Sequence, residues 1–113
     1  MVKIMRIYDS ASPADGKRIY IDRLWPRGMK KEEVKMDEWL KEISPSDTLR
    51  KWFGHDPSKY EEFKKRYIKE LEPHAEILER IKKEGKKEIV TLLFSAKDVG
   101  HNNATVLREY LSQ

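Results

Sequence analysis

Apolar and polar positions are most sharply separated near the C-terminus of the chain. Residues 89–94 are six apolar or β-branched residues in a row, without a charge among them, although 39% of the chain is charged. Such a run predicts a strand in the middle of a sheet, buried on both faces. Mostly polar residues follow over positions 95–103, and a helical spacing then appears at Val106, Leu107, Tyr110 and Leu111. A buried strand, a polar turn and a helix start form the junction at which open α/β sheets usually place a ligand.

Two further strands are predicted in the N-terminal part, where side chains alternate along residues 2–8 and 18–24. The second strand runs into Trp25-Pro26-Arg27-Gly28, where the proline cannot donate to a ladder and the glycine permits a turn. Between the two strands, residues 9–16 have the small, proline and glycine residues of a loop.

Helical spacing fills the middle of the chain. From residue 30 onward it predicts a helix, broken near Asp37, which can cap the second piece, with an apolar stripe of Met36, Trp39, Leu40 and Ile43. A short helix near residues 49–53 stops at Gly54, another restarts at Asp56-Pro57, and a third begins at Pro73 and ends at Gly85. Strands at both ends with helices between them predict a single small α/β domain over residues 1–113, whose sheet of three or four strands is partly covered by helices.

Composition excludes several kinds of chemistry. The 113 residues include no cysteine, which rules out disulfides, thiolate metal sites and thiol nucleophiles. No apolar run is long enough to span a bilayer and no signal peptide opens the chain, so a soluble cytoplasmic protein is expected. The 16 Lys and 13 Glu, against one Gln and two Asn, are typical of proteins from very hot habitats.

The net charge of +4 originates in the N-terminal third of the chain. Residues 1–36 carry nine basic and five acidic side chains, whereas residues 37–113 carry fifteen of each. This surplus favours phosphates, nucleic acid or an acidic partner, and it is equally compatible with a solvated basic surface.

Arg23, Trp25 and Arg27 lie at and just past the end of the second predicted strand. Two guanidinium groups flanking an indole suit a planar anion, because they offer bidentate hydrogen bonds to a phosphate or carboxylate beside a stacking ring. In the alternative interpretation, Trp25 belongs to the core and Asp22 and another acid pair with the arginines.

A second group of candidates follows the central strand. Lys97 can hold a negative oxygen, while Asp98 can act as a base, bind a metal or cap the following helix, a role that Asn102 or Asn103 also suits. His101 titrates near neutral pH and suits acid–base work, although a histidine in a polar turn is often simply solvated. Ser95 lacks the G-x-S-x-G elbow of a serine nucleophile.

His55 precedes Asp56 between two predicted helices, where Asp56 suits a helix cap and His55 can reach a nearby cleft. The three histidines, at positions 55, 74 and 101, lack the spacing of a zinc motif, and no glycine-rich phosphate loop is present. No metal site and no cofactor is therefore predicted.

Several strings together resemble the YeaO-like branch of the domain-of-unknown-function family numbered 488. They lie in residues 20–28, 37–46, 49–57 and 91–98, with His101 and Asn102, and the match covers essentially the whole chain. The resemblance implies a small bacterial or archaeal α/β protein without an established biochemical role. Larger relatives in the wider family tend to have a cysteine where this chain has Ser95, so a shared covalent mechanism is not carried over. The recurring motif positions that carry over are Arg23, Trp25, Pro26, Arg27, Trp52, His55, Asp56, Lys97, Asp98, His101 and Asn102.

Three functional hypotheses follow, and the sequence leaves open whether the protein is an enzyme. In the first, Arg23, Arg27, Lys97 and Asn102 hold a small anionic ligand, phosphorylated or nucleotide-like, Trp25 stacks on it, and His55, Asp98 or His101 move protons if catalysis occurs. In the second, the basic N-terminal third binds nucleic acid. In the third, the protein binds a partner through its aromatic helices and performs no chemistry. No membrane association is expected, and the sequence does not predict an oligomeric state.

Overall fold

A computed structural model describes all 113 residues and shows a parallel sheet with four α-helices. The elements are β1 (Val2–Arg6), β2 (Lys17–Tyr20), β3 (Glu38–Trp39), α1 (Asp47–Phe53), α2 (Tyr60–Leu71), α3 (Ala75–Lys87), β4 (Val90–Phe94) and α4 (Asn103–Leu111). The strands pair in the order β1-β4-β2-β3, and every pair is parallel. The predicted α/β class, with a sheet of three or four strands, is confirmed. None of the helices has the length and apolar content to cross a bilayer.

Strand β4 is the centre of the sheet, as the apolar run predicts. It lies between β1 and β2, with Val90 beside both Val2 and Lys17, and all five of its residues are buried. Because the four strands are parallel, their carboxyl ends meet at one edge of the sheet. The segments that follow β2 and β4, which hold most candidate residues, therefore begin side by side.

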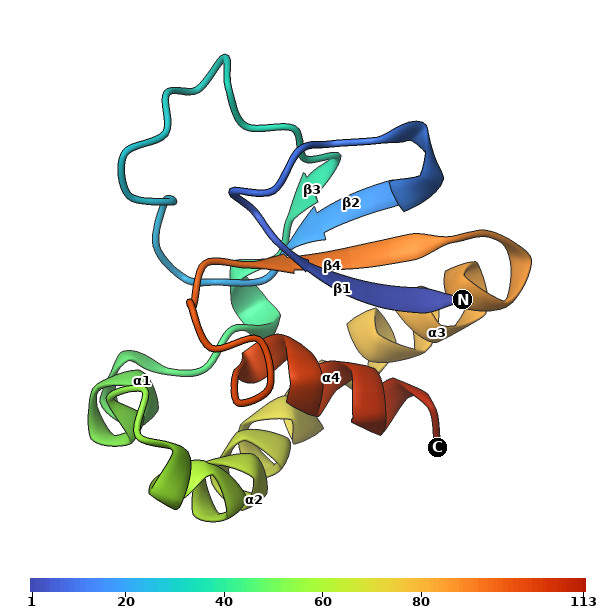
Figure 1. The fold of residues 1–113 in the computed structure, drawn as a ribbon. Helices are drawn as coiled ribbons and strands as arrows, with labels where there is room; N and C mark the ends of the chain where they lie inside the picture. The colour runs from blue at the N-terminus through green and yellow to red at the C-terminus, as the bar shows by residue number, and fades with distance from the viewer.

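The helices lie on one face of the sheet, and loops lie on the other (Figure 1). Since neighbouring residues of a strand point to opposite faces, Leu92 joins the main core with the helices, while Leu93 packs with Ile7 and Tyr20 on the loop side. This smaller cluster is covered by partly buried side chains that come mostly from the long connection between β2 and β3: Met5, Met29, Val34, Met36 and Trp39.

The helix predicted from residue 30 to residue 43 is wrong. Residues 38–39 form β3, residues 41–43 form a single 3-10 turn, and no helix lies between β2 and β3. Backbone pairing with β2 replaces helical hydrogen bonds, since the Leu40 amide donates to the Tyr20 carbonyl at 2.9 Å. The apolar stripe is divided between the two sides of the sheet: Met36 packs with the loop-side cluster and Leu40 with the main core. Asp37 caps no helix; its carboxylate accepts the Arg18 amide at 2.8 Å.

Gly85 does not end its helix, contrary to the sequence prediction. Helix α3 continues to Lys87, and Gly85 is buried where the helix crosses β1. A Cβ atom at this position would lie 2.8 Å from Cγ2 of Val2, so the glycine allows a close approach of helix and strand. By contrast, Gly54 ends α1 in the left-handed conformation, as predicted.

Candidate functional site

A cavity of about 610 Å³ lies at the carboxyl edge of the sheet. Three segments line most of it: residues 22–27 after β2, the end of α1 with the turn that follows it, and the turn from β4 into α4. Among the candidates, the structure brings together Arg23, Trp25, Arg27, His55, Lys97, Asp98 and Asn102. The two groups of candidate residues, which follow separate strands in the sequence, therefore line the same cavity.

Asp22 joins these segments at the base of the cavity. One carboxylate oxygen accepts the Ser95 amide at 3.0 Å and also the Ser95 hydroxyl, and the other accepts Nδ2 of Asn103 at 2.9 Å. The same Asn103 amide group donates to the Ile21 carbonyl at 3.1 Å. Asp22 thus fixes the positions of β4 and α4 relative to the β2 end. Both of its oxygens accept hydrogen bonds from within the chain, and it forms no ion pair with either arginine.

The Arg23 guanidinium is oriented by the segment before α1. Its Nε donates to the Pro45 carbonyl at 3.1 Å, and the group forms no ion pair. Arg27 is exposed; its backbone carbonyl accepts the Tyr8 hydroxyl at 2.9 Å, while its guanidinium has no acidic partner within the chain. The pairing of these arginines with acids, the alternative interpretation, is not found.

Trp25 lies at the cavity mouth and is 40% exposed, outside both apolar clusters. Its Nε1 donates to the Met29 carbonyl at 2.7 Å, and its ring meets Trp39 edge-on with 5.7 Å between centroids. These two contacts, together with the left-handed Gly28 (φ 79°) that turns the loop, fix the orientation of the indole. Trp25 is therefore held in place without belonging to the core.

Lys97 and Arg50 complete the basic lining. Lys97 is exposed and makes no hydrogen bond or ion pair within the chain, whereas Arg50 has only an exposed contact of 3.4 Å to Asp47. Sequence reasoning missed Arg50. Its signal is the spacing to Phe53, because residues three apart on a helix share a face and Phe53 also lines the cavity.

The cavity lining carries more basic than acidic groups. Arg23, Arg27, Arg50 and Lys97 face two carboxylates, Asp22 and Asp98. Because the Asp22 carboxylate is occupied by internal donors, it is a weak competitor for the four cations. The potential in this space therefore favours an anion.

Asp98 stabilises the turn between β4 and α4. Its carboxylate accepts the amides of Gly100 at 2.9 Å and His101 at 3.1 Å, and it contacts Nδ1 of His101 at 3.0 Å. The Gly100 amide, helped by the His101 side chain, lowers the pKa of Asp98 below its usual value. The group therefore stays ionised and suits proton donation poorly.

His101 lies outside the cavity lining, whereas Asn102 lines it with a side chain that is held by the start of α4. The His101 ring packs edge-on against Tyr60 at 5.1 Å, outside the lining. Asn102 caps α4: its Oδ1 accepts the Thr105 amide at 3.0 Å and its Nδ2 donates to the Asp98 carbonyl at 2.9 Å. Because its side-chain oxygen and nitrogen both have hydrogen-bond partners at the start of α4, Asn102 shapes the cavity wall and is not assigned a ligand contact.

His55 lines the cavity from the turn after α1. It has a positive φ of 59°, directly after Gly54, and is the one non-glycine residue of the chain in that region. Such a backbone conformation is uncommon for a residue with a Cβ atom and is frequent at functional sites. The exposed imidazole lies with its centroid 6.4 Å from that of Phe53.

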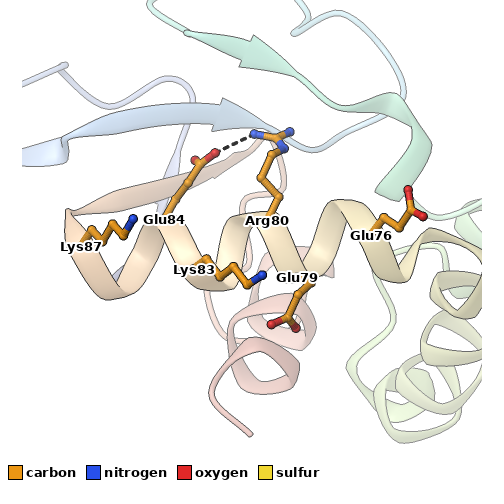
Figure 2. A pocket seen from close by; sticks show the side chains of 6 residues that line it. All are labelled: Glu76, Glu79, Arg80, Lys83, Glu84 and Lys87. Atoms are coloured by element: carbon orange, nitrogen blue, oxygen red, sulfur yellow. Dashed lines mark hydrogen bonds and ion pairs between the residues drawn. The ribbon is translucent and has the colours of Figure 1, made fainter.

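A second hollow, of about 510 Å³, runs along α3 (Figure 2). Its lining is entirely charged, with three acids and three bases: Glu76, Glu79, Glu84, Arg80, Lys83 and Lys87. Arg80 bonds Glu84 and Glu38 at 2.9 Å, and Lys17 joins the same network. Because its charges are balanced and it has no apolar wall, this surface is not a candidate site. The chain also contains no cluster of three or more side chains suited to a metal ion.

Comparison with known proteins places the chain among uncharacterised relatives. A family model described as "Inactive DUF488-N3 subclade" matches residues 1–113. The uncharacterised protein YeaO of Escherichia coli (strain K12) is 44% identical over 110 residues, which are 97% of this chain and 96% of the relative. The uncharacterised protein Rv3073c of Mycobacterium tuberculosis is 35% identical over 111 residues, or 98% of this chain and 93% of the relative. No solved structure matches significantly.

Proposed function

We propose that the cavity of this chain, which belongs to the inactive DUF488-N3 subclade, binds a small anionic ligand and does not turn it over. The resemblance to the YeaO-like proteins is thereby confirmed, and those relatives are themselves uncharacterised. The proposal consequently rests on the chemistry of the cavity and not on any relative's activity.

One observation carries the proposal: four cationic side chains from three separate segments line the same cavity. Arg27 and Lys97 have no ion pair within the chain, so neither must break an existing contact to meet a ligand. The guanidinium of Arg23 is already oriented by its Nε hydrogen bond to Pro45. A planar fork and a flexible ammonium group together suit a phosphate group, which accepts several charge-assisted hydrogen bonds.

Binding without turnover fits the state of the groups that chemistry would use. The Ser95 hydroxyl bonds to the Asp22 carboxylate, and no histidine contacts it, so it lacks the base that activates a serine nucleophile. Asp98 is held by backbone amides that favour its charged form. His55 is the one imidazole of the lining, and it forms no hydrogen bond or ion pair within the chain.

The proposal is tested by ligand-dependent thermal stability. Inorganic phosphate, sulfate, sugar phosphates and nucleotides are added to the native protein and to the Arg27→Ala/Lys97→Ala variant. A matched control, Lys83→Ala/Lys87→Ala, removes the same charge from the α3 surface. A ligand at 100 times its Kd stabilises the native state by about 2.7 kcal/mol, or roughly 10 °C for a domain of this size. We expect this shift in the native and control proteins and its loss in the cavity variant. If no compound raises the midpoint, or if the control loses the shift equally, the proposal is wrong.

Nucleic-acid binding through the basic N-terminal third has less support. Several of the nine cations in that segment have internal partners: Arg6 donates to the carbonyls of Ala96 and Ser95, Arg18 pairs with Asp15 in the interior, and Lys17 pairs with two glutamates. The field available to a polyanion is therefore smaller than the sequence count suggests. A gel-shift measurement with single- and double-stranded DNA at low salt tests this alternative. DNA binding that the Arg50→Ala/Lys97→Ala variant leaves unchanged would favour it, since both residues lie outside the N-terminal third.

A further inference from the structure

The three tryptophans of the chain differ in what covers their rings. The ammonium of Lys41 lies 4.1 Å from the Trp39 centroid, and the guanidinium of Arg66 lies 4.1 Å from that of Trp52. No cation lies over Trp25, although it is the tryptophan at the mouth of the basic cavity. Trp25, which shares the cavity with several basic side chains, is thus the one tryptophan without a cation stacked on its ring.

The hydrogen-bonding capacity of Trp25 is already used. Its single donor, Nε1, bonds to the Met29 carbonyl at 2.7 Å, and an indole has no other polar atom to offer. What Trp25 presents at the cavity is therefore its π surface. Because the loop bond and the edge contact with Trp39 fix the ring in advance, stacking on it requires little further ordering.

Exposed apolar surface gathers around the same opening. Apart from Met1, the large apolar side chains exposed by the fold are Tyr8, Leu24, Trp25 and Val99. The first three line the cavity, whereas Val99 is not a lining residue and only follows Asp98 in sequence. The Tyr8 ring already has the Arg6 guanidinium over it at 4.9 Å, which leaves Trp25 as the free aromatic platform. An aromatic platform beside unpaired cations is the arrangement that binds bases and phosphates of single strands and nucleotides.

We propose that the ligand is a nucleotide, whose base stacks on Trp25 while its phosphate contacts Arg27 and Lys97. This inference rests on the proposed anion-binding function and adds the ligand class. A cavity of about 610 Å³ is in the usual range for a small-molecule site. A free mononucleotide and the 5′-terminal nucleotide of a single strand share this chemistry, because both combine a planar base with a phosphate ester.

The test compares ligands that differ by one chemical part. Isothermal titration at fixed salt measures adenosine monophosphate, ribose 5-phosphate and inorganic phosphate against the native protein, Trp25→Leu and Trp25→Phe. Both variants lose the bond to Met29, but only the phenylalanine keeps an aromatic face, so the pair separates stacking from loop damage. We expect the nucleotide to bind the native protein at least about tenfold more tightly than ribose 5-phosphate. The leucine variant should lose that difference, the phenylalanine variant should keep most of it, and ribose 5-phosphate should bind all three proteins alike.

The outcomes distinguish the two proposals. Equal binding of the nucleotide and ribose 5-phosphate, still abolished by Arg27→Ala/Lys97→Ala, overturns the nucleotide inference and leaves the anion site standing. A loss of ribose 5-phosphate binding in Trp25→Leu assigns the ring to the sugar and likewise overturns it. If none of the three phosphates binds the native protein, the proposed function fails as well. A 5′-phosphorylated oligoadenylate that binds more tightly than adenosine monophosphate identifies the strand end as the source, and weaker binding identifies the free nucleotide.

Discussion

An Asp22→Ala substitution removes the acceptor that joins β2, β4 and α4 beneath the cavity. The carboxylate receives three hydrogen bonds, two from Ser95 and one from Asn103. Hydrogen bonds to a charged group contribute about 1.5–3 kcal/mol each, and water replaces part of this here because Asp22 is only half-buried. We expect a net loss of about 3 kcal/mol in the free energy of unfolding, or about 12 °C in Tm for a domain of this size.

Urea unfolding followed by far-UV circular dichroism at pH 7 measures this loss, and two variants calibrate it. Ser95→Ala removes one of the three donors and leaves the others, so its cost should be about 1 kcal/mol. Asp9→Ala removes an exposed carboxylate that makes no hydrogen bond, and its effect should stay within about 0.5 kcal/mol. If Asp22→Ala costs no more than Asp9→Ala, the carboxylate does not hold the three segments together and the reasoning about the base of the cavity is refuted.

Three further predictions concern the fold. Burial raises the pKa of the Tyr20 and Tyr67 hydroxyls, so the unfolded chain releases these protons at a lower pH than the native protein does. The free energy of unfolding should therefore fall above about pH 10, by up to about 1.4 kcal/mol per pH unit for each tyrosine. Urea titrations of the Tyr67→Phe variant should show a shallower decline. Arg80 and Lys17 beside Glu38 lower the pKa of that carboxyl. A stabilisation of about 1 kcal/mol is therefore present above about pH 4.5 and is lost as the pH falls through the lowered pKa. The Glu38→Gln variant should lose this pH-dependent stabilisation, and an acid unfolding profile equal to that of the native protein would contradict the ion-pair network. Gly85→Ala should destabilise the fold by about 1–2 kcal/mol although alanine has the better helix propensity, because the added Cβ would lie 2.8 Å from Cγ2 of Val2. In a Val2→Ala background, which removes that contact, thermal unfolding should show the same substitution to be neutral or stabilising.

The parts of the fold that the sequence predicts are those with an uninterrupted pattern. Residues 89–94 contain no charged side chain, so both faces of this strand are buried only if it lies in the centre of the sheet. Once the sheet is parallel, the carboxyl ends of β2 and β4 must share an edge, and this geometry brings Arg23 and Lys97 to one cavity.

The remaining parts depend on contacts that local spacing does not encode. Met36 and Leu40 have helical spacing, yet they pack on opposite sides of the sheet because β2 offers backbone partners to the segment between them. The role of Gly85 depends on Val2, which is 83 positions away in sequence, and the role of Asp22 depends on Ser95 and Asn103. Tertiary neighbours decide such positions, so neither propensity nor spacing predicts them.

A titration of the isotopically labelled protein with inorganic phosphate, followed by amide chemical shifts, locates the anion directly. Binding in the cavity predicts the largest shifts in residues 22–28, 50–56 and 95–103, and their disappearance in Arg27→Ala/Lys97→Ala. Shifts concentrated along α3, from residue 76 to residue 87, or no saturable shifts at all, would contradict an anion site at the carboxyl edge of the sheet.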